Sequence, residues 1–204
     1  MSAVASPTPR RVRLPAAVRE QRILDTAADL FYSRGVHEVG MDELVAATGL
    51  GKASVYRVFS SKDALITAYL ARRADTIFSL IDGDMARHEG DPRGAIIAIL
   101  DAVEADLGDP GFRGCAFNNA SIEFGDPNHG ARTVSRQYRQ GVRDRLISLA
   151  TALRGGVEGE QLGEEIALII EGMYLSAAHL GNTGPARRGR ALVERLLDEV
   201  DGAR

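Results

Sequence analysis

Lys52, Ser54, Arg57 and Lys62 are polar side chains of types that bind nucleic acid, and they lie within one short segment. Lysine and serine contact phosphates or base edges, and arginine can bind guanine through two hydrogen bonds. Lys52 and Lys62 are also the only lysines, because 23 of the 25 basic residues are arginine. The segment therefore predicts a surface that binds nucleic acid, with an ordinary solvated face as the alternative.

A second group of polar residues follows in the segment 111–125. Cys115, Asn119 and Glu123 have the spacing i, i+4 and i+8, so one helix face can present all three. Asn118 lies beside them, among the aromatic residues Phe112, Phe117 and Phe124. Aromatic residues with a few polar groups are typical of a small-molecule pocket. The alternative for Asn119 and Glu123 is a buried polar network, and Cys115 is either a reactive sensor or a small buried hydrophobe.

The sequence lacks the patterns of common active sites. It contains no glycine-rich phosphate loop, no metal-ligand pair at i, i+4 and no serine nucleophile elbow. We therefore expect no enzyme activity, no metal and no cofactor.

The composition, 45% apolar and 26% charged, is that of a globular protein, and one cysteine fits a reducing compartment. Apolar runs are too short to span a bilayer and no apolar signal segment follows the N-terminal arginines, so we expect a cytoplasmic protein without membrane contact.

The charge is distributed unevenly along the chain. Residues 1–75 hold eleven basic and eight acidic residues, a net +3, whereas residues 76–204 carry a net −6. This division predicts two functions on one chain. Residues 1–14 are expected to form a flexible basic arm whose arginines, Arg10, Arg11 and Arg13, either contact DNA or belong to a disordered end.

Hydrophobic periodicity, prolines and glycines predict an all-α fold of about nine helices without strands. Pro15 opens the first helix and Gly35 ends it, and Asp91-Pro92, Asp126-Pro127 and Gly184-Pro185 are read as later helix starts. Ser60 to Asp63 resembles a capping box. The remaining expected helices cover 41–48, 52–59, a long stretch from about 62, 92–107, 116–124, 127–154, 160–181 and 185–200.

The second and third expected helices have the layout of a helix-turn-helix. Gly49 can take the left-handed conformation that the tight turn between them needs. The third helix then projects Lys52, Ala53, Ser54, Arg57 and the ring edge of Tyr56 toward a major groove. Lys62, at the start of the next helix, is placed to bind a phosphate.

The chain resembles the DNA-binding domain of TetR-type transcriptional regulators. The matching residues include Leu30-Phe31, Gly35, Met41, Leu44-Val45, Gly49, Lys52, Ser54-Val55-Tyr56, Phe59 and Ser61-Lys62. The resemblance implies a homodimeric, usually repressing, ligand-responsive regulator in which Lys52, Tyr56 and Lys62 touch DNA. Met41 joins this DNA-binding set. Gly40 and Gly51 depart from the family, which usually has Ser or Thr caps there.

The resemblance also predicts the organisation of the chain. We expect a DNA-binding domain over 17–77, with its helix-turn-helix at 40–59, and a helical ligand-binding and dimerisation domain over 78–204. The segment around Cys115 is similar to a Gly-Cys-x-x-x-Asn-x-x-x-Glu pattern of one group of these regulators. Further pocket candidates, each alternatively a core residue, are Phe78, Met85, Tyr138 and Tyr174. Glu171 interrupts an apolar run, which places it in a pocket, at a subunit boundary or on the surface.

Small and apolar residues on the last two helices predict the dimer interface. These are Gly172, Ser176, Ala177, Leu192 and Leu196. The expected partners are thus a double-stranded DNA operator, a small-molecule effector of unknown identity and a second copy of the chain. The expected function is that of a repressor released by its ligand. An activator or ligand-independent regulator is the first alternative, and an all-helical enzyme or interaction module is the second.

Overall fold

The structure, a computed structural model, describes residues 14–182 and 184–202. The described residues form nine helices and no strand, as expected. They are α1 (Ala16–Arg34), α2 (Met41–Thr48), α3 (Lys52–Tyr56), α4 (Lys62–Arg87), α5 (Pro92–Leu107), α6 (Ala116–Glu123), α7 (Gly130–Arg154), α8 (Gly156–Leu180) and α9 (Pro185–Gly202). Arg10, Arg11 and Arg13 of the expected basic arm lie outside the described residues.

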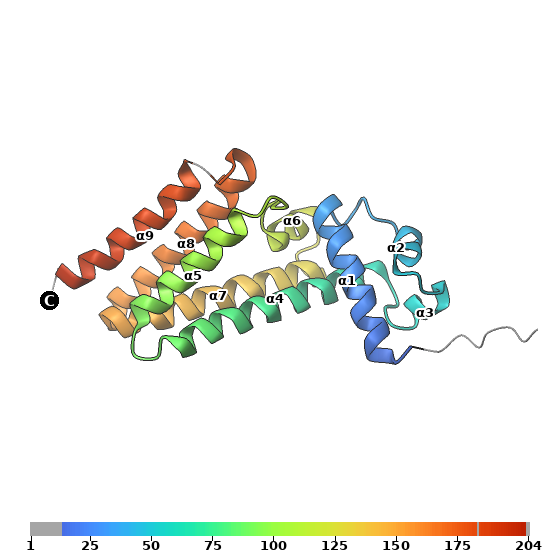
Figure 1. Ribbon diagram of the computed structural model, residues 1–204, viewed down its shortest axis with the longest axis horizontal. Coiled ribbons are helices and arrows are strands. Elements are labelled where there is room, and N and C mark those ends of the chain that lie inside the picture. Colours follow the sequence, from blue (N-terminus) through green and yellow to red (C-terminus); the bar gives the residue numbers. More distant parts are fainter. Residues whose placement is uncertain (1–13, 183, 203–204) are drawn as a thin grey trace, which may run out of the picture.

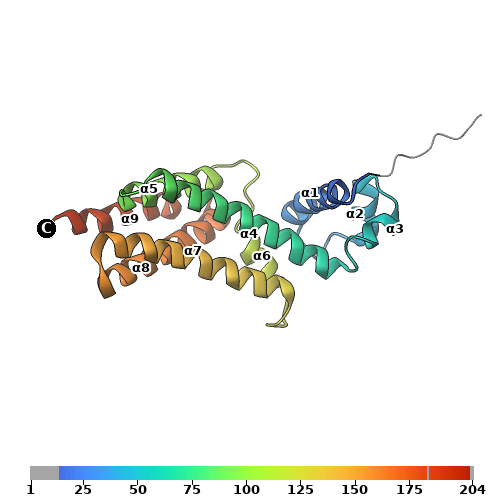
Figure 2. The same ribbon diagram turned by 90° about the horizontal axis from the view of Figure 1, so that it is seen from below.

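The molecule is elongated, with α1 to α3 at one end and α5, α8 and α9 at the other (Figure 1). The long helices α4 and α7 run side by side, and both views place α6 between the two ends (Figure 2). One hydrophobic cluster joins α1 to the first half of α4 and also includes Phe117 of α6 and Ala131 of α7. The other cluster joins α5, α8 and α9 to the second half of α4 and to α7. Because α4 belongs to both clusters, it connects the two ends mechanically.

Capping side chains begin several helices at the expected positions. The Ser61 hydroxyl accepts a hydrogen bond from the Ala64 N–H at 3.1 Å, and Asp91 accepts one from the Gly94 N–H at 2.9 Å. Both bonds satisfy amide groups that the first turn of a helix leaves without a partner. The sequence therefore predicts the starts of α4 and α5 from local chemistry alone.

Three expected helix boundaries differ from the structure by three or more residues. The third helix ends at Tyr56 instead of residue 59, because the Val58 N–H bonds to the Val55 carbonyl three residues back and tightens the chain there. Asp126 caps a turn by accepting from the Asn128 N–H, so α7 begins at Gly130 instead of residue 127. The eighth helix begins at Gly156, four residues earlier than expected, directly after a turn.

Helices α7 and α8 cross closely because two glycines of α8 lie at the contact. A Cβ atom on Gly159 would lie 2.5 Å from the Thr151 Cα atom, and one on Gly163 would lie 2.5 Å from the Ile147 Cα atom. Both distances are shorter than any ordinary carbon–carbon contact. The approach of these two backbones therefore requires glycine at both positions.

Candidate nucleic-acid interface and interior cavity

The turn between α2 and α3 is fixed by backbone conformation and by buried side chains. Gly49 has φ 65° and ψ 14°, the left-handed conformation that the sequence predicts. Leu44 and Val55 are fully buried and hold the two helices together. The buried Thr48 hydroxyl donates to the Val45 carbonyl at 2.7 Å and accepts from the Leu50 N–H at 3.1 Å. Thr48 is thus a structural residue of the turn that sequence reasoning missed.

The expected DNA-contacting residues of α3 lie together at the end of the molecule. Lys52, Ala53 and Arg57 are exposed, Tyr56 is 38% exposed and Ser54 is half-buried. Only Val55 of this helix is buried. The helix therefore uses one residue for packing and presents its other side chains to solvent, as an element that enters a groove must do.

The two remaining members of the set have different surroundings. Lys62 opens α4, is half-buried, and donates to the His37 carbonyl oxygen at 3.2 Å. Met41 opens α2 and packs against the hydrophobic cluster around α1. Lys62 therefore offers a positive charge beside α3, whereas Met41 contributes mainly to packing.

Lys52 forms an ion pair with a carboxylate of the preceding helix. Its Nζ atom lies 2.6 Å from Asp42 Oδ1, and both side chains are exposed. The hydrogen bond to Asp42 and its negative charge raise the pKa of Lys52 above its usual range. Lys52 is therefore positively charged in the free protein and already has a partner.

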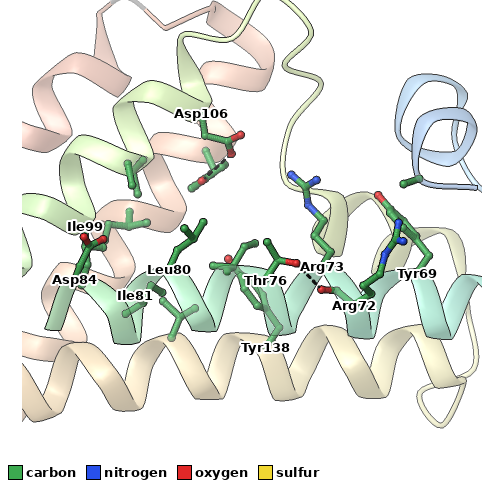
Figure 3. Close-up of a pocket in the computed structure, with 17 residues that line it drawn as sticks. Tyr69, Arg72, Arg73, Thr76, Leu80, Ile81, Asp84, Ile99, Asp106 and Tyr138 are labelled. Atoms are coloured by element: carbon green, nitrogen blue, oxygen red, sulfur yellow. Dashed lines mark hydrogen bonds between the residues drawn. The ribbon is translucent and has the colours of Figure 1, made fainter. Parts of the chain in front are cut away.

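A cavity of about 410 Å³, partly open to solvent, lies where α4 meets α1, α5, α7 and α8 (Figure 3). Its volume is within the range of small-molecule sites. One face of α4 lines its length, through residues that recur every three or four positions: Tyr69, Arg72, Arg73, Thr76, Ile77, Leu80, Ile81 and Asp84. The opposite walls carry Ile99, Val103, Asp106, Tyr138, Ile170 and Tyr174, among others.

Two of the expected ligand-binding residues line this cavity, namely Tyr138 and Tyr174. The Tyr174 hydroxyl donates to Asp106 Oδ2 at 2.9 Å. Burial, with a smaller effect of nearby charges, raises the pKa values of Tyr138 and Tyr174 well above their usual range. Both hydroxyl groups therefore stay neutral and can donate hydrogen bonds at any physiological pH.

Two aromatic or apolar candidates lie in the packing around the cavity instead of lining it. The Phe78 ring stacks on Tyr138 with a centroid distance of 5.8 Å, and the Arg145 guanidinium lies 4.2 Å from the Phe78 centroid. Met85 packs against the cluster around α5 and α8. For these two residues the structure agrees with the core alternative.

The residues around Cys115 do not share one pocket, so the expected common ligand face is wrong. Cys115, Asn118 and Glu171 line a smaller space of about 50 Å³, which shares Tyr138 and Tyr174 with the main cavity. Asn119 instead donates to the Arg113 carbonyl oxygen at 2.9 Å and lines a separate depression against α1.

Glu123 joins α6 to the DNA-binding end of the molecule. Its carboxylate accepts from the His37 N–H at 3.1 Å, and the His37 ring nitrogen Nε2 lies 2.8 Å from the Glu123 carbonyl oxygen. His37 in turn accepts from Lys62 through its own carbonyl group. The structural alternative for Glu123, a polar network, is therefore the arrangement observed.

Sequence reasoning missed the residues at the polar end of the cavity. The Tyr69 hydroxyl is buried and has no hydrogen-bond partner in the described part of the chain, and the residue is 3% exposed. The Arg73 guanidinium lies over the Tyr32 ring at 5.2 Å, and Arg72 pairs with Asp25 of α1 at 2.7 Å. A detectable signal was their spacing, which places Tyr69, Arg72 and Arg73 on one face of a long helix.

The residues expected at a dimer interface divide into two groups. Ala177 is buried within the chain, and Leu196 packs against the cluster around α5 and α8. Gly172 is exposed and would have no atom within 4 Å of an added Cβ, Leu192 is 40% exposed, and Ser176 is half-buried. Leu168 and Leu175, which flank Gly172 on α8, are 71% and 58% exposed. The outer face of α8 is thus more apolar than a solvent-facing helix usually is.

The described residues offer neither a membrane span nor a cluster of metal ligands. In the ranges 14–182 and 184–202, none of the helices has both the length and the apolar character that a membrane span needs. Over the same ranges, histidine, cysteine and acidic side chains form no cluster of three or more that could hold a metal ion.

Comparisons with known proteins agree with this geometry. A family model described as bacterial regulatory proteins, tetR family, matches residues 23–69. The chain is 34% identical over 97 residues to the HTH-type transcriptional activator FasR of Mycolicibacterium smegmatis, which covers 46% of this chain and 44% of the relative. It is 44% identical over 63 residues to the uncharacterized HTH-type transcriptional regulator Rv1255c of Mycobacterium tuberculosis, covering 31% of this chain and 29% of that relative. The chain thus spans less than half the length of these curated relatives.

Solved structures match over a much larger part of the chain. SCO4454, a TetR-family transcriptional regulator from Streptomyces coelicolor, has a TM-score of 0.84 at 29% identity, covering 90% of this chain and 96% of that chain. A TetR transcriptional regulator from Chloroflexus aurantiacus has a TM-score of 0.77 at 25% identity, with the same coverage of both chains. The similarity therefore includes the cavity-forming helices as well as the helix-turn-helix.

Proposed function

Because the chain belongs to the TetR family of bacterial regulatory proteins, we propose that it binds an operator in double-stranded DNA and represses transcription until a small molecule releases it. The observation that carries this proposal is the combination of an exposed helix-turn-helix at one end with a 410 Å³ cavity behind it. An enzyme would need reactive groups converging on the cavity, but this cavity has only neutral tyrosines and paired acids beside its arginines. Such a regulator of chromosomal genes works in the cytoplasm.

The DNA-binding surface in this proposal is α3 with the start of α4. Arg57 is exposed and can bind a guanine edge through two hydrogen bonds, whereas Lys52 and Lys62 are suited to phosphates. Ala53 and Ser54, as small residues near the start of α3, allow the backbone to approach the base pairs closely. Tyr56 supplies an exposed ring edge and hydroxyl group beside them.

The cavity is coupled to the DNA-binding end through contacts that its own lining residues make. Arg72 pairs with Asp25 and Arg73 lies over Tyr32, and both partners belong to α1. A molecule that moves these arginines therefore moves α1 relative to α4. The proposed mechanism is a shift in population toward an arrangement in which the recognition helices no longer match the operator.

The homodimer is proposed to form through the outer faces of α8 and α9. Gly172 permits a close approach of a partner helix, and the exposed leucines Leu168, Leu175 and Leu192 supply apolar area. A two-fold dimer would present two α3 helices to successive major grooves about 34 Å apart. The operator should accordingly be a palindrome.

Selection of genomic fragments by the purified protein tests the function. We expect recovery of a palindromic sequence near a promoter. Substitution R57A should weaken binding to that sequence by about 10- to 100-fold and relax the preference at one position of each half-site. Substitution R136A, which changes an exposed arginine of α7, is the matched control and should leave affinity unchanged. Equal retention by wild type and R57A would contradict the proposal.

An activator is the second candidate, because one relative, FasR, is named as a transcriptional activator. The same surface and cavity serve both functions, so the site does not separate them. The position of the recovered operator relative to the promoter distinguishes a repressor from an activator. An operator overlapping the promoter supports repression, and one upstream of the promoter, with transcription rising in the presence of the protein, supports activation.

A further inference from the structure

We propose that the effector is an amphipathic carboxylate, with its anionic group at Arg73 and Tyr69 and its apolar body along Leu80, Ile81 and Ile99. This inference rests on the proposed function, since it identifies the chemical class of the ligand that the cavity takes. It follows from an imbalance between hydrogen-bond donors and acceptors at one end of the cavity.

Two donors at that end have no acceptor among the described residues. The Tyr69 hydroxyl is buried and has no partner among the described residues, and the residue is only 3% exposed. Leaving a buried hydroxyl without a partner is unfavourable, so such groups commonly mark a site that a ligand or water completes. Arg73, one turn further along α4, lies over the face of the Tyr32 ring and forms no ion pair with the described residues. Figure 3 shows both side chains rising from α4 at the same end of the cavity.

The other charged groups of the cavity already have partners. Arg72 pairs with Asp25, Asp106 accepts from Tyr174, and Asp84 pairs with Arg87. A cationic group at the Tyr69 end would be repelled by the guanidinium groups of Arg72 and Arg73, which line the cavity there. An anion instead supplies acceptors to Arg73 and Tyr69, where the described residues supply none. This end of the cavity thus favours an anion.

The rest of the cavity is suited to an apolar body. Beyond Thr76 the lining face of α4 presents Ile77, Leu80 and Ile81, and Ile99 and Val103 of α5 stand opposite. Eight residues separate Arg73 from Ile81, which corresponds to about 12 Å along a helix. The cavity is therefore long enough for an extended apolar chain whose polar group stays at one end.

The polar end also adjoins the DNA-binding domain. Ala28 of α1 lines the same cavity, and the ring on which Arg73 rests, Tyr32, belongs to α1. Tyr32 additionally accepts from the Arg113 N–H and donates to the Gly114 carbonyl, which ties α1 to the segment before α6. A carboxylate that draws Arg73 toward itself weakens its contact with Tyr32. The anionic group of the ligand is therefore the part that transmits the signal.

Isothermal titration calorimetry with decanoate tests the class of ligand, using the full chain without DNA. Decan-1-ol and decylammonium are the matched probes, because they keep the apolar chain and change only the head group. We expect decanoate to bind at least about tenfold more tightly than either probe. Tighter binding of decylammonium, or no binding of decanoate, would overturn the inference.

Two variants locate the anion. Substitutions R73Q and Y69F should each weaken decanoate binding by about 10- to 100-fold, since each removes one hydrogen bond to a charged group. Y69F should leave the melting temperature unchanged or slightly raised, because the lost hydroxyl has no partner in the free protein. Thus a loss of binding in Y69F cannot be attributed to unfolding. R136Q, on the exposed surface of α7, is the control. Unchanged affinity in both R73Q and Y69F would overturn the inference.

A separate measurement distinguishes this inference from the proposed function. Release of a labelled operator fragment by decanoate is followed by fluorescence anisotropy. Binding of decanoate in calorimetry without release of DNA contradicts ligand-controlled repression and supports the ligand class. Release by decylammonium but not by decanoate supports ligand control and overturns the carboxylate.

Discussion

Replacement of Gly163 by alanine should destabilise the protein through a contact that can be stated atom by atom. The new Cβ atom would lie 2.5 Å from the Cα atom of Ile147 and 2.8 Å from its backbone nitrogen. Backbone atoms in the middle of α7 cannot rotate away, unlike the end of a long side chain. The two helices must therefore move apart, and that movement loosens the contacts of neighbouring pairs along their crossing.

The size of the effect comes from two opposing contributions. Overpacking a core costs about 1–3 kcal/mol, and a clash with backbone belongs at the upper end of that range. Replacing glycine by alanine within a helix raises the free energy of unfolding by about 1 kcal/mol, because alanine has the higher helix propensity. We expect a net loss of about 2 kcal/mol in the free energy of unfolding. For a chain of this size that corresponds to a fall of about 4–8 °C in melting temperature.

Thermal unfolding followed by circular dichroism at one fixed protein concentration measures this loss. G83A is the matched control: Gly83 lies inside α4, and its added Cβ would meet only the end of the Arg87 side chain, at 3.3 Å. This variant should gain about 0.5–1 kcal/mol, because the flexible arginine can move and the helix propensity remains. If G163A is as stable as G83A, the α7–α8 crossing is not as close as described and the reasoning fails.

Two further predictions concern assembly and pH. L175E should convert the dimer to a monomer of 21.9 kDa in sedimentation velocity, because it would bury a charge at the proposed α8 interface. I122E, which changes an 84%-exposed position of α6, is the control and should leave the dimer intact. If both variants remain dimers, the proposed interface is wrong. The free energy of unfolding should fall as pH rises above about 10, because unfolded tyrosines then lose protons that Tyr138 and Tyr174 keep when folded. Urea unfolding at pH 8 to 11 measures this, and a constant stability would refute it.

Local chemistry explains why much of the fold was predictable from the sequence. Ser61, Asp91 and Gly49 act through their immediate neighbours, so their roles as two caps and a left-handed turn follow from residues within three positions. Asp126 shows the limit of such reasoning. Its side chain can cap either a helix or a short turn, and the pattern Asp-Pro alone does not distinguish the two outcomes.

The candidate site was less predictable, because periodicity does not tell what lies opposite a helix face. The spacing of Asn119 and Glu123 correctly indicates a shared face, but that face meets α1 instead of the main cavity. Conversely, Tyr69 is the last residue of the segment that matches the family model, and Arg73 lies within the expected DNA-binding domain over 17–77, which concealed their position at the cavity. A link between the two ends through the fourth helix could be predicted from the sequence, but only the packing of α1 and α5 around α4 places Tyr69 and Arg73 at the cavity.

The ion pair between Lys52 and Asp42 gives the proposed DNA surface an internal competitor. In a loosely bound duplex, a phosphate would give Lys52 an interaction no stronger than its existing ion pair with Asp42, whose Oδ1 atom lies 2.6 Å from Nζ. Exchange becomes favourable only when α3 is seated deeply enough for a phosphate to replace Asp42 while the neighbouring side chains reach the bases. If Lys52 binds DNA as proposed, Asp42 would therefore weaken its contribution at non-operator sites, where phosphate contacts supply nearly all of the affinity.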